Sequence, residues 1–600
     1  MDTLVSVSPD ELLARWLQEF DGALSRNDVA AAMALFLPDA YWRDIVAFTW
    51  NIHTADGQDA IRSLLEACLA GAAPSAWKAD GPARLVDGVV EGAVTFETAV
   101  ARGSGVVRLR DGRCWTLLTA MTGLKGHEEA IGTGRPLGVS LAYQAGRPSP
   151  AVRKAQEQAE IGTTRQPYCL VVGAGHAGLA LGARLKHLGV PTLLIDRLER
   201  PSDTWRNRYD ALMLHSPVLF DEMPYLSYPT GWPVFRSKDQ VAAWLDAYAA
   251  LMELDIWTGT ECRSAVFDEE HDEWRVEVIR GGRVMTLRPK QLVFASGLSG
   301  PPNVPKFPGA ADFKGEQHHA SAHRGGPAYK GRRCVVVGAN TSGHDICAAL
   351  WEAGADVTMI QRTPTIVVRL PWLMQTIGSL YSDAAVAQGM TPDRADLLFA
   401  STPFRLQAQL QVPLTAKLQQ QEAAFYARLE KAGFLLTDGE DHSGIIPQLY
   451  RRASGYYMDV GASELIANGS IKVRSGVNIE TIRAHSVVLS DGSEIPADVI
   501  VYATGFSPAG GWAAQVLPPE MVEKVGKIYG LGSGVRGDPG PWEGELRNLW
   551  KPTQQKALWF HGGNFSTSRL FSRALALQIK AREAGIPTPV YALAESHHTQ

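Results

Sequence analysis

Three glycines, Gly173, Gly175 and Gly178, have the spacing with which a backbone loop can bind a pyrophosphate. In such a loop the first glycine permits a tight turn, the second lets the phosphates approach the backbone, and the third lets a helix pack closely on a strand. The free N–H groups and the partial positive charge at the start of that helix favour the phosphates. The spacing therefore indicates a dinucleotide site.

The residues around these glycines predict the elements that such a site needs. Leu170–Val172 is an apolar run typical of a buried strand, a helical pattern ends at Gly189, and Thr192–Ile195 predicts a second strand. Asp196 follows, about twenty residues after the glycines, where a carboxylate binds ribose hydroxyls. We assign to this first site Gly173, Gly175, His176, Ala177, Gly178, Asp196, Arg197, Thr204, Trp205, Leu214 and His215.

A second stretch, Cys334–Arg362, repeats the order of strand, turn, helix and strand. Asn340 replaces the middle glycine, and Arg362, beside Gln361, stands where the first stretch has its acid. Asparagine tolerates left-handed backbone, so we expect the turn to survive, although the side chain crowds the pyrophosphate. A cation at the strand end favours the 2′-phosphate of NADPH, unless Arg362 is only a solvated surface charge.

The first site therefore matches FAD and the second NADPH, with NADH as a weaker alternative. We assign to the second site Gly338, Asn340, Thr341, Ser342, Gly343, Asp345, Arg362, Thr504 and Gly505. Two such sites in one chain imply hydride transfer from nicotinamide to flavin. Disulfide reductases also pair these sites, but they need two close cysteines soon after the first, and none lies between Asp196 and Cys262.

The composition is that of an ordinary globular chain, with 45% hydrophobic and 20% charged residues. Its 600 residues exceed the usual size of one core, so two or three domains are expected. The net charge of -5 gives no general attraction to nucleic acid or anionic membranes. No signal peptide or membrane-spanning window is recognised, and the six cysteines lack metal-ligand spacing. We expect a cytoplasmic protein with reduced thiols and no metal, nucleic-acid or membrane partner.

Composition and periodicity divide the chain into consecutive segments with different expected roles. They are an α+β domain (1–126), a linker (127–166), the first part of an FAD-binding domain (167–330), an NADPH-binding domain (331–497) with a helical insertion at about 370–457, and a return segment of the FAD-binding domain (498–600). An insertion of this length often covers a substrate channel.

Local signals predict several elements of the first segment. Ser8 and Glu11 are spaced as a capping box at the start of a helix. A second helix is expected over Val29–Phe36, ending at Pro38. Asp111-Gly112 predicts a hairpin turn between two strands.

Four motifs in the correct order resemble those of the flavin-containing monooxygenases and their Baeyer–Villiger relatives. They are the two glycine-rich sites, the turn Ala503–Gly505, and Phe313–His323, which is similar to the family fingerprint F-x-G-x-x-x-H-x-x-x-(aromatic). The resemblance covers about residues 166–580. His323 in place of the final aromatic, Asn340, and the extra N-terminal domain resemble the branch called type II.

The N-terminal segment separately resembles the SnoaL-like cone fold. Some cones are enzymes with Asp or His pairs inside, so Asp44 and His53 are candidates for chemistry. A role in docking or dimerisation is the favoured alternative. The two resemblances together imply an α/β fold with two Rossmann-type domains, for FAD and NADPH, preceded by a small α+β SnoaL-like cone domain.

The family resemblance also implies a reaction. NADPH would reduce FAD, O2 would form a flavin hydroperoxide, and one oxygen atom would pass to a small organic substrate, a soft sulfur or nitrogen compound or a ketone. The type II branch is associated with relaxed coenzyme choice. An NADPH oxidase that releases hydrogen peroxide and a flavin-bearing sensor remain alternatives. We expect the protein to be a homodimer.

Three histidines are candidates for catalysis: His215, His319 and His323. His215 falls where many family members have an asparagine near the flavin, and Trp205 falls where the family packs the flavin. With an unperturbed pKa of about 6.5, a histidine could donate a hydrogen bond to the peroxide without forcing one protonation state. A purely structural histidine is the alternative. His319 and His323 precede the second site and are expected to hold the coenzyme and the inter-domain linker.

Overall fold

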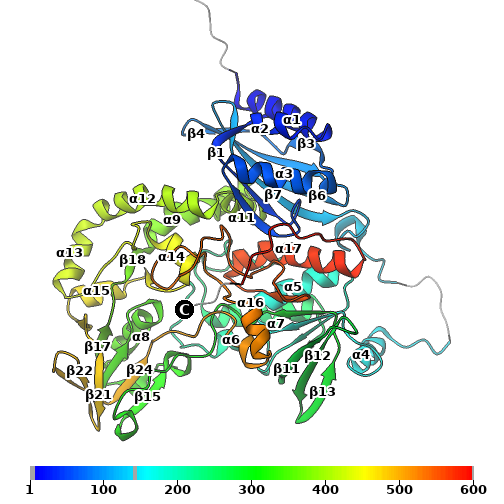
Figure 1. The fold of residues 1–600 in the computed structure, drawn as a ribbon. Helices are drawn as coiled ribbons and strands as arrows, with labels where there is room; N and C mark the ends of the chain where they lie inside the picture. Colours follow the sequence, from blue (N-terminus) through cyan, green and yellow to red (C-terminus); the bar gives the residue numbers. More distant parts are fainter. Residues whose placement is uncertain (1–6, 140–144, 597–600) are drawn as a thin grey trace, which may run out of the picture.

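Three large sheets organise the chain in the computed structural model, which describes residues 7–139 and 145–596 (Figure 1). The N-terminal sheet and its helices form one body at one end of the molecule, and two parallel sheets lie below it. Helices from residues 370–452 lie at the junction between that body and the parallel sheets.

The N-terminal body is an α+β domain. α1 (Pro9–Ser25), α2 (Val29–Ala34) and α3 (Gln58–Ala72) accompany a seven-stranded sheet of order β2-β1-β7-β6-β5-β3, with β4 paired to β5. Its strands are β1 (Phe36–Ile45), β2 (Ile52–Asp56), β3 (Ser75–Ala79), β4 (Arg84–Val86), β5 (Val89–Glu97), β6 (Ala101–Arg110) and β7 (Arg113–Leu124). β1 pairs in parallel with β7, while β2 pairs antiparallel with β1, so the sheet is mixed.

Local signals locate α1 and the β6–β7 turn correctly. Ser8 and Glu11 form the expected reciprocal capping box, and Asp111-Gly112 adopts positive φ angles of 51° and 73°. α2 is shorter than predicted, because β1 begins at Phe36 and continues through Pro38. The ring of Phe36 is buried among aromatic side chains of α1 and β1. Burial and strand pairing therefore override the helical pattern there.

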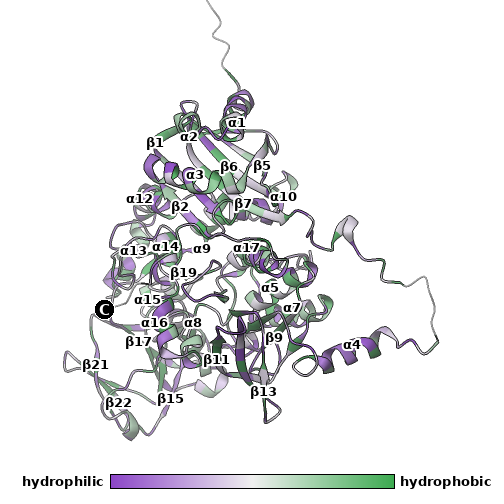
Figure 2. Ribbon diagram, turned by 45° about the vertical axis from the view of Figure 1, so that its right-hand side comes forward, coloured by the Kyte–Doolittle hydropathy of each residue, from purple (hydrophilic) through white to green (hydrophobic). Residues whose placement is uncertain are grey.

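The linker contains a helix that the sequence analysis did not predict. α4 (Pro150–Glu160) has Ser149 as its N-cap and buries none of its residues. It lies on the outside of the molecule and is largely hydrophilic (Figure 2), and Gln158 and Lys154 connect it to Asp255 and Glu253 of the first nucleotide domain. A capping serine, a proline in the first turn and a run of good helix formers explain it locally.

The first parallel sheet has the order β10-β9-β8-β14-β25. Its strands are β8 (Cys169–Val172), β9 (Thr192–Ile195), β10 (Ile256–Trp257), β14 (Gln291–Phe294) and β25 (Leu558–Phe560). The accompanying elements are α5 (His176–His187), α6 (Asp203–Arg206), α7 (Lys238–Leu251), α17 (Phe565–Glu583) and an antiparallel sheet of β11 (Thr260–Asp268), β12 (Glu273–Arg280) and β13 (Arg283–Leu287). β25 pairs in parallel with β14, so the end of the chain returns to this domain.

The second parallel sheet has the order β15-β24-β16-β17-β20. Its strands are β15 (Glu316–His319), β16 (Arg333–Val337), β17 (Asp356–Gln361), β20 (Lys472–Ser475) and β24 (Val499–Tyr502). The accompanying elements are α8 (Thr341–Glu352), α15 (Ala462–Ala467) and an antiparallel sheet of β21 (Ile479–Arg483), β22 (Ser486–Leu489) and β23 (Glu494–Pro496).

Two strands of this second sheet lie outside the segment 331–497 that the sequence analysis gave to it. They are β15 and β24, which we had placed in the FAD-binding domain. All four residues of β24 are buried, and the strand lies between β15 and β16, where both of its backbone edges are paired. The second domain therefore begins before residue 331 and ends after residue 497.

The helical insertion leaves the second domain at one short sheet and returns to it there. β18 (Ile366–Arg369) pairs in parallel with β19 (Tyr456–Asp459). Between them lie α9 (Leu370–Leu380), α10 (Asp383–Ala387), α11 (Pro392–Ala400), α12 (Phe404–Gln421), α13 (Ala423–Lys431) and α14 (Ile445–Arg452). α16 (Pro519–Val525) follows the second domain.

A buried ion pair joins the N-terminal body to the rest of the protein. Arg43 on β1 donates from Nε and Nη2 to the two carboxylate oxygens of Glu545, both at 2.7 Å. Its Nη1 donates to the carbonyl oxygen of Ala400 at 2.7 Å, and Thr54 donates its hydroxyl to Glu545 at 2.6 Å. The Arg43 and Glu545 side chains are only 4% and 3% exposed. These contacts fix the body in place independently of the linker.

We expect Arg43→Met to weaken this docking by about 3–5 kcal/mol, because Glu545 would keep a buried charge without its partner. Urea unfolding followed by tryptophan fluorescence should show a lower midpoint, and trypsin should cleave the linker faster. The exposed Arg113 supplies the control, and Arg113→Met should change neither result.

The double variant Arg43→Met/Glu545→Gln should recover most of the loss, since it removes both buried charges. If Arg43→Met alone unfolds at the parental urea concentration, the ion pair does not hold the N-terminal body.

Candidate active site

The first glycine loop has the geometry of a pyrophosphate cradle. Gly173 has a φ of 109°, and a Cβ at this position would collide with the carbonyl oxygen of Ala295. A Cβ on Gly178 would collide with the carbonyl of Gly173, so only glycine lets α5 pack this closely. Gly175 caps α5, and among the described residues no atom lies within 4 Å of where its Cβ would be. The loop therefore leaves room for phosphates before the free N–H groups of α5.

Asp196 supports this loop directly. Its carboxylate accepts the backbone N–H of Ala174 at 2.8 Å and that of Leu198 at 2.9 Å. Burial raises its pKa, while these backbone hydrogen bonds oppose that shift. Each carboxylate oxygen keeps further acceptor capacity, which fits the binding of ribose hydroxyls. The acid thus has a structural task in addition to the predicted one.

Aromatic side chains cover the start of α5. The rings of His176 and Phe565 stack at 4.4 Å, and Trp205 lies 5.7 Å from Phe565. His176 Nε2 lies 3.0 Å from the carbonyl oxygen of Gly563, and burial lowers the pKa of this histidine to about 4. Of the other predicted residues, Ala177 and Leu214 are buried, and Thr204 and Arg197 are exposed. The guanidinium of Arg197 stacks on the indole ring of Trp512 at 4.0 Å.

The second glycine loop reproduces the backbone contacts of the first. Gly338 has a φ of 121°, and a Cβ there would collide with the carbonyl oxygen of Ala503. A Cβ on Gly343 would collide with the carbonyl of Gly338. Asn340 caps α8 with φ −98° and ψ −171°, which is extended backbone. The expected left-handed conformation of Asn340 is therefore wrong, because the middle position of the loop is extended in both domains and accepts any residue.

Strand register identifies Gln361, not Arg362, as the residue that corresponds to Asp196. In each domain the first glycine donates its N–H to the carbonyl of the residue just before this position, Ile195 or Ile360. Gln361 is buried, and its amide bonds to four groups within the second domain. Arg362 follows it, is exposed, and forms no ion pair with any residue that the structure describes. The acid is thus replaced by a neutral amide, with a free cation one residue later.

His319 holds the turn that follows β24. Its Nε2 lies 2.8 Å from the carbonyl oxygen of Gly505, and its Nδ1 lies 2.8 Å from the hydroxyl of Ser321. Thr504 donates its hydroxyl to the carbonyl of Asn303 at 2.6 Å. Burial lowers the pKa of His319. Since both of its ring nitrogens are engaged, the geometry suits a linker residue better than a proton donor.

His323 ends a chain of polar groups in the linker between β15 and β16. Glu316 lies 3.1 Å from Nδ1 of His318, whose Nε2 lies 3.0 Å from Nδ1 of His323. Nε2 of His323 is buried and has no partner within the described ranges, and burial lowers the pKa of this histidine to about 4. No contact between described residues joins His319 or His323 to His215. The three candidate histidines therefore do not form one cluster.

His215 lies where the two nucleotide domains meet. Its Nε2 is 3.8 Å from Oδ1 of Asp345 on α8, and the two side chains are 5% and 8% exposed. Tyr209 donates its hydroxyl to Oδ2 of the same carboxylate at 2.7 Å, and it also contacts Ser342. Thr341 donates to a carbonyl of β19. Nδ1 of His215 is buried and without a partner among the residues described, so it is free to bond a bound molecule.

The sequence analysis placed the loop that begins at His561 in the return segment of the FAD-binding domain but assigned no site residue in it. Both ring nitrogens of His561 are buried without a partner in the described part of the chain, and burial lowers its pKa to about 3. Gly563 has a φ of 121°, and Trp550 donates its indole N–H to the carbonyl of Gly562 at 3.1 Å. A Cβ on Gly562 would touch Gly297 in the turn after β14. The order of strand, paired glycines and helix is the one expected for the return of the chain to the first domain.

Asp44 and His53 face each other across β1 and β2, but Asp44 is occupied by structural hydrogen bonds. Thr119 donates its hydroxyl to Oδ1 at 2.6 Å, and Thr49 donates its hydroxyl to Oδ2 at 2.7 Å. Two backbone N–H groups also donate to Oδ2. Burial raises the pKa of Asp44. The carboxylate therefore orders the loop between the two strands.

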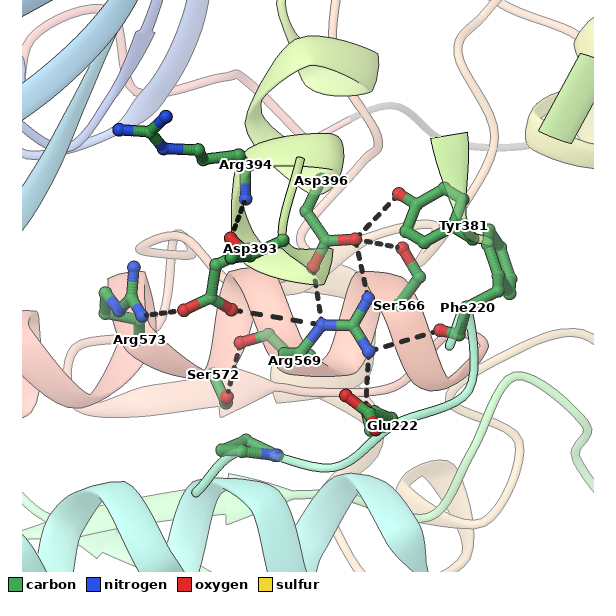
Figure 3. A network of polar contacts seen from close by, with 12 residues as sticks. Phe220, Glu222, Tyr381, Asp393, Arg394, Asp396, Ser566, Arg569, Ser572 and Arg573 are labelled. Carbon is green, nitrogen blue, oxygen red and sulfur yellow. Dashed lines mark hydrogen bonds and ion pairs between the residues drawn. The ribbon is translucent and has the colours of Figure 1, made fainter. Parts of the chain in front are cut away.

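A second buried ion pair fixes the helical insertion to the first domain (Figure 3). Arg569 on α17 donates from Nε and Nη2 to the two carboxylate oxygens of Asp396 on α11, both at 2.8 Å. Its Nη1 donates to two carbonyl oxygens in the segment after His215. Tyr381 and Ser566 donate their hydroxyls to Asp396 at 2.8 and 2.7 Å. The insertion is thereby held over α17.

Three further observations bear on cofactors and location. All six cysteines are free thiols. Within residues 7–139 and 145–596, no group of three His, Cys, Asp or Glu side chains could hold a metal ion. In the same ranges, no helix has the length and apolar character needed to cross a membrane.

Comparisons with known proteins agree with two linked dinucleotide sites. A family model described as pyridine nucleotide-disulphide oxidoreductase matches residues 170–381. The chain is 32% identical over 379 residues to the indole-3-pyruvate monooxygenase YUCCA1 of Oryza sativa subsp. japonica, covering 62% of this chain and 85% of that protein. It is 28% identical to the probable indole-3-pyruvate monooxygenase YUCCA10 of Arabidopsis thaliana, over 64% of this chain and 90% of that protein.

Among solved structures, an open crystal structure of cyclohexanone monooxygenase superposes with a TM-score of 0.50 at 18% identity. The match covers 70% of this chain and 88% of that chain. At this identity the likeness shows the fold alone, which is the predicted α/β arrangement of Rossmann-type sheets.

We expect Gly175→Val to fold normally but to lose FAD, because its side chain would fill the open space before α5 without touching the protein. Flavin absorbance and circular dichroism of the purified variant would measure the two effects separately. Gly178→Val is the matched contrast: its Cβ would meet a backbone carbonyl, so it should disturb the fold itself. A folded Gly175→Val protein with parental flavin content would contradict this assignment.

Proposed function

The chain belongs to the flavin monooxygenase family, and we propose that it uses NADPH and O2 to insert one oxygen atom into a small organic substrate at a bound FAD. The second oxygen atom leaves as water, with one proton taken up, and NADPH becomes NADP⁺. The observation that carries the proposal is the pair of matched glycine loops in one chain, each with its first and third glycines packed against backbone before a helix.

The residues present fit both cofactors. FAD, when bound, accepts a hydride from NADPH and activates O2 for the transfer. The loop from Gly173 to Gly178 would hold the pyrophosphate of FAD, and Asp196 would bind its ribose. The loop from Gly338 to Gly343 would hold NADPH, with Arg362 at the 2′-phosphate. Replacing the acid by neutral Gln361 removes the negative charge that would repel that phosphate.

We assign His215 as the hydrogen-bond donor at the site of oxygen transfer. Its Nδ1 is buried without a partner among the described residues, while Asp345 lies beside its Nε2. A ring protonated on both nitrogens would donate to Asp345 through Nε2 and to the transferred oxygen through Nδ1. The ion pair of Asp396 and Arg569 fastens the insertion to α17, and Arg569 also binds two carbonyls in the segment after His215. A covered site of this kind would keep water away from the oxygen transfer.

The proposed substrates are soft sulfur and nitrogen compounds and ketones. Sulfur or nitrogen compounds and ketones require different protonation states of the transferred oxygen. A hydrogen-bond donor that works with either state therefore suits both substrate classes. The rice relative acts on indole-3-pyruvate, a carbonyl compound, which supports the ketone class.

The N-terminal domain is proposed to complete the site and to do no chemistry. Its Asp44 is occupied by structural hydrogen bonds, and its Arg43 anchors the domain. A relationship to SnoaL-like cones stays a prediction, which the packing of three helices on one mixed sheet supports.

We expect the parent protein to convert benzyl methyl sulfide to its sulfoxide and 4-phenylbutan-2-one to an ester. His215→Ala should still oxidise NADPH, but its product per NADPH should fall by roughly tenfold or more, because the transferred oxygen loses its donor. Hydrogen peroxide should rise by the amount of product lost. Product analysis, peroxide release and NADPH absorbance would measure this balance.

The exposed His485 provides the control, and His485→Ala should keep parental coupling. Parental coupling in His215→Ala would leave His215 without this role. Peroxide equal to NADPH in the parent, with no product from any substrate, would favour an NADPH oxidase instead.

We expect Arg362→Ala to raise the KM for NADPH by about tenfold to a hundredfold, as the loss of one charge-assisted contact of about 1.5–3 kcal/mol predicts. The KM for NADH should change little, because NADH lacks the 2′-phosphate. Arg483→Ala alters an exposed arginine of β21, outside both predicted sites, and should change neither value. Equal effects of Arg362→Ala on both coenzymes would show that Arg362 is structural.

A further inference from the structure

Arg236 holds the backbone on both sides of His215. The N–H of Leu214 donates to the carbonyl oxygen of Arg236 at 2.8 Å. The guanidinium of Arg236 donates from Nη2 to the carbonyl oxygen of Ser216 at 3.4 Å. His215 lies between these two residues in the chain. A single arginine therefore limits the movement of the backbone that carries the His215 imidazole.

The side chain of Arg236 is itself fixed by a buried carboxylate. It is fully buried and forms an ion pair with Asp221, whose side chain is 1% exposed. Nη1 of the guanidinium donates to the carbonyl oxygen of Val234 at 2.6 Å. The hydroxyl of Ser216 donates to the two oxygens of Asp221 at 2.9 and 2.7 Å. Because a buried charge must stay with its partner, the position of Arg236 follows that of Asp221.

Asp221 is held in turn by Arg569 on α17. Nη1 of Arg569 donates to the carbonyl oxygens of Phe220 and Glu222 at 3.2 and 2.6 Å, so it holds the backbone on both sides of Asp221 (Figure 3). Nε and Nη2 of the same guanidinium bind Asp396 of the helical insertion. The two arginines therefore repeat one arrangement, in which each holds the two neighbours of the next side chain.

We propose that these contacts form a positioning network through which the helical insertion sets the position of the His215 imidazole. From the insertion to the imidazole, the network consists of Asp396, Arg569, Asp221, Arg236 and His215. The inference rests on the proposed monooxygenase function and adds Asp221 and Arg236 to it as positioning residues, which act through His215. The hydrogen-bond donor is then in place only when the insertion covers the site, which ties oxygen transfer to the exclusion of water.

Single substitutions in the FAD-loaded, full-length protein can break each link of the network. Arg236→Lys keeps a positive charge beside Asp221, but one ammonium group cannot replace a guanidinium that donates to a carboxylate and two carbonyls. Asp396→Asn weakens the other end of the network. Ser216→Ala removes only the hydroxyl bonds to Asp221, and it is the milder alternative if Arg236→Lys fails to fold.

Arg547→Lys is the matched control for Arg236→Lys. The Arg547 side chain is also buried, at 2% exposed, and its guanidinium donates to the carboxylate of Glu543 and to two backbone carbonyls. These partners all lie within residues 539–543, outside the positioning network.

Hydrogen exchange of residues 212–222, measured by mass spectrometry without NADPH, reports on the network independently of activity. We expect Arg236→Lys to speed exchange of the Leu214 amide by about tenfold, because the carbonyl that accepts its hydrogen bond is no longer fixed. Asp396→Asn should speed exchange in the same segment by about threefold, although Asp396 reaches it through Arg569. Arg547→Lys should leave exchange in this segment unchanged.

Product per NADPH with benzyl methyl sulfide tests the consequence for oxygen transfer. Burial raises the pKa of Asp221 to about 6, while the guanidinium of Arg236 opposes this shift, so an assay at about pH 8 keeps the carboxylate ionised. Arg236→Lys and Asp396→Asn should each lower product per NADPH by about threefold to tenfold, and hydrogen peroxide should rise by the amount of product lost. FAD content and the KM for NADPH should stay parental. The double variant should be no worse than the worse single variant, because both substitutions interrupt one network.

Parental exchange of residues 212–222 in Arg236→Lys would overturn the inference. If the parent forms product, an unchanged product per NADPH in Arg236→Lys would overturn it as well. A double variant whose loss equals the product of the two single losses would show that the two ion pairs act separately, which also contradicts the network. Exchange as expected, in a protein whose parent forms no oxygenated product, would refute the proposed function and leave the positioning network standing.

Discussion

The structure of both nucleotide sites depends on a close approach of backbone to backbone where a helix meets the glycine turn before it. In each nucleotide domain the third glycine of the loop lies against the carbonyl of the first, and the first lies against a carbonyl of the neighbouring strand's turn. Any side chain at these positions would separate the helix from the sheet. The direction of the helix, and therefore the place where its free N–H groups point, depends on this contact. The geometry of both sites therefore depends on this contact between helix and glycine turn.

The same contact explains where the two domains can differ. The first and third loop positions touch backbone, but the middle one is extended in both domains, so Asn340 can replace glycine there without backbone strain. The residue at the end of the second strand of each domain can also vary. Asp196 and Gln361 occupy this position, and both make structural hydrogen bonds there with different partners. Coenzyme choice can thus vary at the residues that face the ligand while the turn stays constant.

Much of the fold could be predicted from the sequence because the signals lie in residues that are close together in the chain. The capping box at Ser8, the turn at Asp111-Gly112 and the strands around both glycine loops depend on neighbouring residues. The predictions are wrong where pairing between strands that are distant in the chain decides the structure. β1 takes Phe36 out of the predicted helix, and β24 joins the second sheet, because each pairs with a strand far away in the chain.

The candidate site could likewise be predicted only where its signals are local. The glycines follow from spacing alone, but the position equivalent to Asp196 required the strand register. The meeting of His215 with Asp345 depends on how the two domains face each other, which spacing cannot show. The buried pairs Arg43–Glu545 and Asp396–Arg569 join residues 502 and 173 positions apart in the chain, so no local pattern predicts them.

The return of the chain end to the first sheet has a consequence for synthesis on the ribosome. β14 ends at Phe294, but its neighbour β25 begins only at Leu558, and α17 follows. The N-terminal domain and the second sheet use segments that emerge earlier, so they can form while the chain is still being made. The flavin domain must wait, with one edge of its central sheet exposed, until β25 and α17 have left the exit tunnel. Premature termination between β24 and α17 would therefore yield a chain with a coenzyme domain but without a completed flavin domain.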